Sequence, residues 1–433
     1  MIFARSLPVV LTLIATLLHA QTQPVPFDVP TAPELSLGIE EKPNSVAEDE
    51  QLFFYGYLQS LLYLQRQHYL VHVENLLGST VAEPVEYNGS NSTFTLQQLN
   101  LFLHKPFAQR YSAFIDFEAQ ASYSSEKNWG AFNLQEAWID YTYSDQLGLK
   151  LGLLLPVFNN LNEIQNRLPL FPYLARPAVY EVLLSGIYTF EDFRPEQAFA
   201  QLSGYAPVGR FRLEYALHLG NNEQSYITTA APGSGMGPSG GAITIFRGED
   251  VGLFKAVGGR VGTTLDDESL KVGLSSTYDH DRRTEPSGGM LGNVPGTQLP
   301  ALGNVPRVRL GADLSFHLGS FSFESEYIRV MHELQTGGID LTRQFAYFNL
   351  TWYPTITWFL YAGINYLNSH AYDHLVSDPT PDRVGQYLFI GGTGYRLAPT
   401  LTAKFQYLHF RTGENTYVDI RCNYFMTGLS LMF

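Results

Sequence analysis

Charged residues and cysteines are scarce in this chain of 433 residues. Only 16% of the residues are charged, against about a quarter in an ordinary soluble protein. The single cysteine, Cys422, excludes an internal disulfide. Beyond residue 20, no apolar run approaches the ~18 residues that indicate a transmembrane helix. The net charge of -14 argues against a nucleic acid as partner, because phosphate neutralisation needs clustered Lys and Arg.

Apolar residues are abundant instead. They make up 45% of the chain, and aromatic residues alone make up 14%, which excludes a disordered chain because such a chain has few aromatics. The length suits roughly two or three soluble domains of about 150 residues each. No change in composition divides the chain in that way.

The first 20 residues have the pattern of a secretory signal peptide. A positive stretch that ends at Arg5 precedes an apolar stretch over residues 7–18, and Ala20 offers a small residue at the cleavage site. An uncleaved membrane anchor is the alternative, but about 12 apolar residues are too few for the ~20 that cross a bilayer as a helix. We therefore predict that residues 1–20 are a cleaved signal peptide of an exported protein.

Residues 21–50 are rich in Pro and contain seven acidic residues against a single lysine. Such a composition is typical of an unpacked segment, and we predict a periplasmic leader here. From residue 51 to residue 433 the pattern changes to short segments in which apolar and polar residues alternate. These residues are predicted to form one domain.

Alternation is clearest over residues 147–155. Leucines occupy every second position, whereas Gly148, Lys150 and Gly152 lie between them. In a β-strand these two sets lie on opposite faces. Similar segments predict sixteen strands, at residues 52–66, 93–104, 110–122, 131–144, 147–157, 195–206, 209–220, 250–263, 268–280, 305–317, 320–334, 341–353, 356–368, 384–395, 399–411 and 418–433.

The connections between these strands are alternately short and long. The short ones lie at residues 105–107, 144–146, 206–208, 265–267, 318–319, 354–355 and 398–399. Outer-membrane barrels have short periplasmic turns and long external loops, and their sheet closes because unpaired backbone groups are costly in lipid. The predicted fold class is therefore all-β, a transmembrane antiparallel up-and-down β-barrel of about 16 strands. Aromatic residues beside the short turns are expected at the periplasmic interface: Tyr141, Tyr143, Trp352, Tyr353 and Trp358.

Three segments resemble those of Gram-negative outer-membrane porins. Phe433 ends the amphipathic segment 429–433 and resembles the assembly signal of that class. Residues 134–141 read Leu-Gln-Glu-Ala-Trp-Ile-Asp-Tyr, and residues 149–158 read Leu-Lys-Leu-Gly-Leu-Leu-Leu-Pro-Val-Phe. This pair resembles the phosphate-selective porin O and P family over residues 130–185, whereas the barrel pattern covers nearly all of the chain beyond residue 50.

The resemblance implies that the third long connection, residues 158–194, folds into the lumen and forms the pore constriction. The residues that would face the permeating solute are Asn159, Asn160, Asn162, Glu163, Asn166, Arg167 and Arg176. The alternative is an external loop that covers the mouth of the barrel.

Strand parity assigns most charged strand residues to the lumen, because Lys or Arg on the lipid face costs ~2–4 kcal/mol at the midplane. The basic ones are Lys150, Arg210, Arg212, Lys271, Arg307, Arg309 and Lys404, and the acidic ones are Asp116, Glu118, Glu136, Asp140, Glu214, Asp313, Glu324 and Glu326. The bases at 210, 212, 271, 307 and 309 are expected to form a basic strip opposite the acidic second to fourth strands. Such a strip would orient dipolar solutes and set ion preference.

The chain departs from the phosphate-selective family in its charge. It has no lysine between Lys150 and Lys255, and its balance is acidic. The sequence therefore leaves three alternatives for the channel: weak preference for cations, passage of small neutral solutes, and selectivity for phosphate. The histidines are dispersed, and the pairs His68/His72 and His370/His374 lack an accompanying metal-binding motif. We expect no metal, no cofactor and no enzyme activity.

The sequence thus predicts an outer-membrane porin, a water-filled diffusion channel for ions and small hydrophilic solutes. A channel selective for anions such as phosphate, or for sugars or carboxylates, is one alternative. A non-conducting barrel that acts as an adhesin or scaffold is another. Expected partners are outer-membrane lipid and lipopolysaccharide, the barrel-assembly machinery, permeating solutes and further copies of the chain in a homotrimer.

Overall fold

The computed structural model describes residues 51–71, 85–122, 131–181, 193–222, 254–265, 268–281, 305–332, 341–370, 383–412 and 418–433. The predicted signal peptide and leader, residues 1–50, lie outside the described residues. No helix in this part of the chain is long and apolar enough to cross a membrane.

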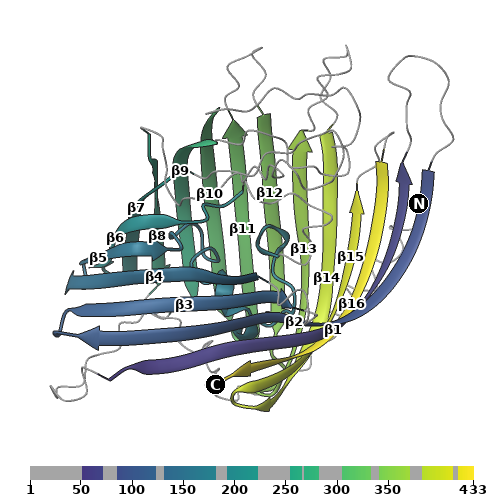
Figure 1. Cartoon of the computed structure of the whole chain (residues 1–433), viewed down its shortest axis with the longest axis horizontal. Coiled ribbons are helices and arrows are strands. Elements are labelled where there is room, and N and C mark those ends of the chain that lie inside the picture. Colours follow the sequence, from purple (N-terminus) through teal and green to yellow (C-terminus); the bar gives the residue numbers. More distant parts are fainter. Residues whose placement is uncertain are drawn as a thin grey trace, which may run out of the picture. The chain divides into compact units, whose positions relative to one another are not determined.

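Sixteen β-strands make up most of the described residues and follow one another around a barrel (Figure 1). They are β1 (Phe53–Val71), β2 (Val85–Phe107), β3 (Tyr111–Ser122), β4 (Ala131–Ser144), β5 (Leu147–Leu154), β6 (Ala198–Val208), β7 (Phe211–Gly220), β8 (Ala256–Leu265), β9 (Leu270–Asp281), β10 (Val305–Leu318), β11 (Phe321–His332), β12 (Leu341–Trp352), β13 (Trp358–His370), β14 (Arg383–Ala398), β15 (Leu401–Thr412) and β16 (Val418–Met432). Two short 3-10 helices, η1 (Gln165–Leu170) and η2 (Ala178–Tyr180), lie between β5 and β6.

The sheet closes by pairing of the first strand with the last. Each strand is antiparallel to its sequence neighbours, and β1 pairs with β16 in a register that sets Tyr57 opposite Met432. The amide N–H groups of Gly56 and Phe433 donate to each other's carbonyl oxygens, with N···O distances of 2.8 and 3.0 Å. The predicted fold class, an antiparallel up-and-down barrel of sixteen strands, is confirmed.

Alternation along each strand separates an apolar outer face from the inner face. In β10, Arg307 and Arg309 point into the barrel and are buried, whereas the next residue, Leu310, is 42% exposed on the outer face. In β7, Leu213 and Leu217 are exposed on the outside, while Glu214 lies on the inner side in ion pairs. A barrel whose apolar face is outermost suits lipid, because lipid, unlike water, imposes no cost on exposed apolar side chains.

Short turns join β2 to β3, β4 to β5 and the later pairs up to β14 and β15, and the other connections are longer, except that those from β12 to β13 and from β15 to β16 are equal in length. The first predicted turn, residues 105–107, is wrong by about three residues. β2 continues through Pro106 to Phe107, and the turn lies at Ala108 and Gln109, which have φ of 49° and 61°. Pro106 does not end the strand, because proline is tolerated near the end of a strand where a missing donor costs little.

Most of the predicted aromatic residues at the short-turn rim point outward. Tyr143 is 62% exposed and Trp358 is 40% exposed, and Trp352 stacks on Phe321 of the neighbouring strand. Tyr353 differs, because it packs inward against Phe359 and the hydrophobic cluster inside the barrel. The reason is that Tyr353 lies beyond the end of β12, where strand parity no longer fixes its side.

Candidate functional site

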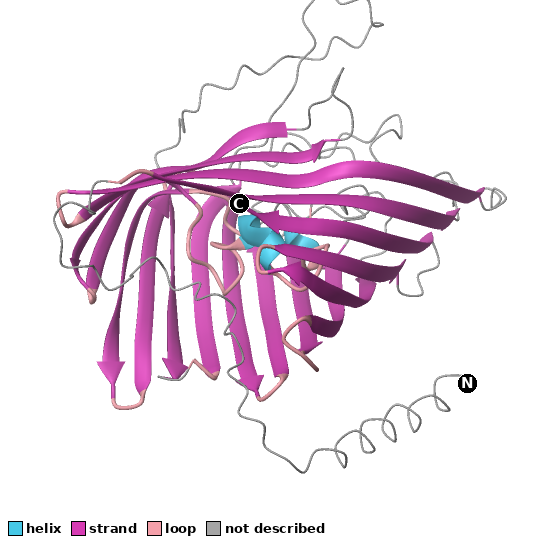
Figure 2. Ribbon diagram, turned by 90° about the horizontal axis from the view of Figure 1, so that it is seen from below, coloured by secondary structure: helices cyan, strands magenta, loops and turns pink. Residues whose placement is uncertain are grey.

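The connection from β5 to β6 runs inside the barrel. We call its residues 155–181 the inward loop; the short helices η1 and η2 belong to it and lie within the ring of strands (Figure 2). The loop turns inward at Asn159, whose φ of 52° lies in the left-handed region that asparagine tolerates better than most residues. Residues 182–192 of the predicted loop segment lie outside the described residues.

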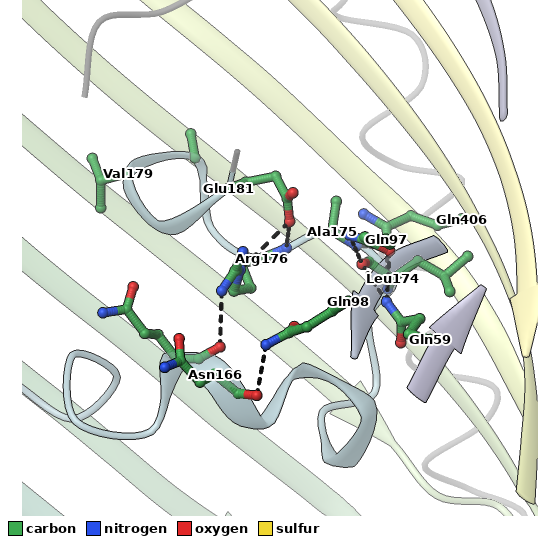
Figure 3. Close-up of polar contacts among 12 residues, drawn as sticks. Gln59, Gln97, Gln98, Asn166, Leu174, Ala175, Arg176, Val179, Glu181 and Gln406 are labelled. Atoms are coloured by element: carbon green, nitrogen blue, oxygen red, sulfur yellow. Dashed lines mark hydrogen bonds and ion pairs between the residues drawn. The ribbon is translucent and has the colours of Figure 1, made fainter. Parts of the chain in front are cut away.

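Side chains of β9, β11, β13 and β15 hold the loop by its backbone N–H groups. The Glu326 carboxylate accepts from the amides of Asn160 and Leu161 at 3.0 and 2.8 Å. Gln406 Oε1 accepts from the amides of Leu174 and Ala175 at 2.6 and 3.0 Å (Figure 3). Two further strand oxygens accept from loop amides, Ser275 Oγ from Asn159 and Asn365 Oδ1 from Ala178.

Strands on another part of the wall bind the carbonyl groups of the loop. A β-bulge in β2 turns the adjacent residues Gln97 and Gln98 to the inside. Gln97 and Gln59 of β1 both donate to the carbonyl oxygen of Leu174 at 2.9 Å, and Gln98 donates to that of Asn166 at 2.7 Å (Figure 3). The loop is therefore fixed to strands from several parts of the barrel wall.

Lys404 of β15 completes this set of anchors. Its buried ammonium group donates to the carbonyl oxygens of Pro169 and Phe171, at 3.0 and 2.6 Å. These carbonyls lie at the end of η1, where helical carbonyls lack partners within the helix. Lys404 thus serves the loop and does not line open water.

The apolar side of the loop packs against the inner faces of β11 to β16. Leu168, Leu174 and Tyr180 of the loop belong to one buried cluster with inward-facing residues of these strands, such as Phe345 and Phe410. The inner face of this part of the wall is therefore apolar and bulky. Its apolar residues are covered by the loop.

Two tyrosines of the loop hydrogen-bond to carboxylates of β11. Tyr180 donates to Glu326 at 2.8 Å, and Tyr173 donates to Glu324 at 3.4 Å. Burial, followed by the nearby negative charge of these glutamates, raises the pKa of both hydroxyls well above the ordinary value. The tyrosines therefore stay protonated and act as donors.

The inward-facing bases of β7 to β9 form an ion-pair network around Glu214. Its carboxylate lies 3.0 Å from Arg212, 3.6 Å from Arg260 and 3.8 Å from Lys271. Arg260 also donates two hydrogen bonds to the Asp313 carboxylate in a bidentate contact, at 2.9 and 2.6 Å. The Cβ of any larger residue at position 273 would lie within 2.5 Å of this pair, so a glycine there makes room for it.

A second network joins Arg307 and Arg309 through Asp279. Arg307 donates to both carboxylate oxygens at 2.8 and 2.5 Å, and Arg309 donates to one at 3.2 Å. All three side chains are at most 1% exposed. The predicted basic strip is therefore interrupted by carboxylates from its own strands.

Sequence reasoning missed Arg260 and Asp279. Both had a usable signal, because Arg260 alternates with the outward residues Val257 and Val261, and Asp279 shares the parity of Lys271. Arg210 was assigned wrongly. It lies exposed in the turn before β7, which begins at Phe211, and so shares no strand face with Arg212.

The remaining predicted residues fall into two groups. Asp116, Glu118, Asn162, Asn166 and Arg176 are buried between loop and wall, where Asn166 donates to Asp116 at 3.1 Å and Arg176 lies 3.7 Å from Glu181. The others are partly exposed on the inner side: Glu136, Asp140, Lys150, Asn160, Glu163 and Arg167. Lys150 and Glu163 form an ion pair at 3.3 Å, each side chain being 17% exposed.

Several buried polar atoms at the loop have no hydrogen-bond partner among the described residues. They include Asn159 Oδ1, Asn160 Nδ2, Asn162 Oδ1, Gln98 Oε1 and Gln406 Nε2. Buried polar groups in proteins are usually bonded to protein or ordered water. Ordered water enclosed between the loop and the wall would supply the missing partners of these atoms.

No group of three or more His, Cys, Asp or Glu side chains suited to a metal ion occurs among the described residues. His68 lies at 2.8 Å from Asn88 and near Glu86, on the extended hairpin of β1 and β2. Its sequence partner His72, and His374 of the other pair, lie outside the described residues.

Solved structures similar to this one are outer-membrane proteins. An anion-selective porin from Comamonas acidovorans matches with a TM-score of 0.52 and 12% identity, over 89% of this chain and 100% of that one. A loop-deletion mutant of OmpT, an outer-membrane protein of Vibrio cholerae, matches with a TM-score of 0.50 and 11% identity, over 89% and 100% of the chains. OmpF of Salmonella typhi, in complex with daunomycin, matches with a TM-score of 0.50 and 10% identity, over 90% of this chain and 99% of that one.

No protein-family model and no curated protein matches the sequence. The resemblance to the phosphate-selective porin O and P family is accordingly not confirmed. The similarity to solved structures concerns the fold: the chain forms a closed sixteen-strand barrel of the kind found in outer-membrane porins.

Proposed function

We propose that the protein is an outer-membrane porin, a water-filled diffusion channel for ions and small hydrophilic solutes. The observation that carries the proposal is a closed barrel of sixteen strands in which the inward loop leaves charged side chains partly exposed on the inner side. Sixteen strands enclose more space than their own side chains fill, which leaves room for water. The chain is therefore proposed to have no enzymatic role.

The inward loop is proposed to form the constriction. Its apolar side is occupied by β11 to β16, so the open path is proposed to run along the side that carries the partly exposed charged groups. The partly exposed charged groups there include Lys150, Glu163, Arg167, Arg212, Glu214 and Lys271. Asn159, Asn162, Asn166 and Arg176 act mainly as anchors of the loop.

The pairing of charges supports weak ion selectivity. Bases and acids alternate in the networks around Glu214 and Asp279, which reduces the transverse field that a one-sided basic strip would produce. Strong phosphate selectivity is not favoured, because the bases of the proposed strip already have carboxylate partners. Small hydrophilic solutes that carry at most a single charge suit this lumen best.

The cellular setting follows from the same proposal. Residues 1–20 would direct export and be cleaved, residues 21–50 would remain in the periplasm, and Phe433 would serve the barrel-assembly machinery. Exposed leucines and phenylalanines on the outer face suit contact with lipid and lipopolysaccharide. A homotrimer is proposed by analogy with porins of similar size.

Swelling of liposomes tests the proposal against the alternative of a non-conducting scaffold or adhesin. We expect the purified, folded barrel to admit a pentose and a hexose at rates that fall with solute size, and to exclude a tetrasaccharide, because the loop narrows the lumen. Liposomes containing heat-unfolded protein are the control. Swelling no faster than in this control would contradict the channel and favour the scaffold.

A further inference from the structure

Arg167 is exceptional among the inward-facing bases of the described residues. Its guanidinium makes neither a hydrogen bond nor an ion pair within the described part of the chain, although it is only partly exposed. The other bases are held by carboxylates or carbonyl groups, as shown above for Lys150, Arg176, Arg212, Arg260, Lys271, Arg307, Arg309 and Lys404. A guanidinium with five donors therefore remains available at the loop.

The backbone around Arg167 is fixed on both sides. Its own amide donates to the carbonyl oxygen of Ile164 at 2.9 Å. The preceding residue, Asn166, is bound to Asp116 and Gln98, and the following residue, Leu168, is fully buried. The side chain is thus presented from a rigid support, which reduces the entropy lost when it binds a ligand.

Two hydroxyl groups on β1 add to this set of donors. Leu170, at the end of the helix η1 that holds Arg167, packs against the cluster of Tyr57, Phe102 and Phe114, and Tyr55 packs on the same cluster. The helix therefore lies beside both tyrosines, and the guanidinium of Arg167 interacts electrostatically with them. Neither hydroxyl makes a hydrogen bond within the described residues. Both rings are held by Phe102, which lies 5.0 Å from the ring of Tyr55 and 5.3 Å from that of Tyr57. The two hydroxyl groups therefore have fixed positions and can still donate hydrogen bonds to a ligand.

The surrounding charges limit which anion such donors suit. Asp116 also interacts electrostatically with Arg167, but its two oxygens already accept from Asn100 at 2.9 Å and Asn166 at 3.1 Å. Glu136 on the adjacent strand accepts from Trp138 at 2.9 Å. These carboxylates do not neutralise the guanidinium by contact, yet their negative charge opposes a doubly charged anion.

We propose that Arg167, Tyr55 and Tyr57 form a binding site for the carboxylate group of small monocarboxylate solutes passing through the lumen. A carboxylate matches the planar fork of a guanidinium with two parallel hydrogen bonds, and the hydroxyls offer further donors. Inorganic phosphate is a mixture of monoanion and dianion at neutral pH, and the neighbouring carboxylates disfavour the dianion. The proposal deepens the porin function and rests on it for its transport role.

Titration of channel current with propionate tests the site. In planar bilayers, we expect sodium propionate to reduce the KCl current of the full-length protein saturably, and inorganic phosphate to do so far more weakly. Arg167→Gln should raise the half-blocking concentration about tenfold, since a charge-assisted pair is lost. The double variant Tyr55→Phe/Tyr57→Phe should raise it severalfold. Arg110→Gln, in the exposed turn between β2 and β3, is the matched control and should match the unaltered protein.

Saturation-transfer NMR of propionate with the detergent-solubilised barrel provides a reading that needs no conduction. Transfer that disappears in Arg167→Gln but persists in Arg110→Gln supports the site. If the Arg167→Gln channel conducts and propionate blocks it at the same concentration as the unaltered protein, the site is overturned and the porin function stands. Absence of any KCl current overturns the porin function. The NMR experiment then decides the site by itself, and a lack of saturation transfer to propionate overturns the site.

Discussion

Replacement of Asp279 by asparagine is expected to lower the free energy of unfolding by about 3–5 kcal/mol. Asp279 is 1% exposed and holds the guanidinium groups of Arg307 and Arg309, which are themselves buried. Without its negative charge, two like charges remain close together in an environment that screens them poorly. Equilibrium unfolding by guanidinium chloride, followed by heat-modifiable migration on a gel, measures the loss.

Glu268→Gln is the matched control for this substitution. This substitution also removes a negative charge opposite an arginine, since Glu268 lies 3.5 Å from Arg212. The Glu268 side chain, however, is 50% exposed. Exposed pairs contribute little, about 0–1 kcal/mol, because solvent screens them. A loss for Asp279→Asn no larger than for Glu268→Gln would contradict the account of a buried network.

Removal of two loop anchors, in the double variant Glu326→Ala/Gln406→Ala, is expected to make the channel current unsteady. The substitution leaves the amides of Asn160, Leu161, Leu174 and Ala175 without their acceptors. A buried donor without a partner costs about 1–3 kcal/mol, so the loop gains by moving to where water reaches these groups. Single-channel recordings should show several current levels and severalfold greater open-channel noise.

Gln65→Ala provides the control for the anchor variant. Gln65 faces the inside as well, but its amide donates to the hydroxyl of Tyr424 at 2.7 Å, a contact within the wall. Its current should stay as steady as that of the unaltered protein. Equal noise in the double variant and in this control would show that the anchors do not hold the loop still.

The barrel was predictable because lipid imposes a simple rule on each strand. Residues such as Leu149 and Lys150 must take opposite sides, and this local alternation suffices to place all sixteen strands. Errors occurred where the rule ends. Arg210 lies in a turn and Tyr353 beyond a strand, so parity did not apply to either.

The interior was less predictable, because contacts inside a barrel join residues far apart in the sequence. Alternation indicates that Phe345 and Phe410 face inward, yet only the loop explains why apolar residues are tolerated there. Likewise, parity places Lys404 inside but does not reveal that it binds loop carbonyls. The lack of partners that makes Arg167 a candidate contact for solutes is visible only once its neighbours are known.

Single-channel conductance of the purified, heat-modifiable barrel in planar bilayers tests the central claim most directly. The account predicts stepwise insertion events with a conductance that rises in proportion to KCl concentration, and a reversal potential under a salt gradient that indicates only weak ion preference. A correctly folded barrel that inserts without conducting, or one that is strongly anion-selective, would contradict it.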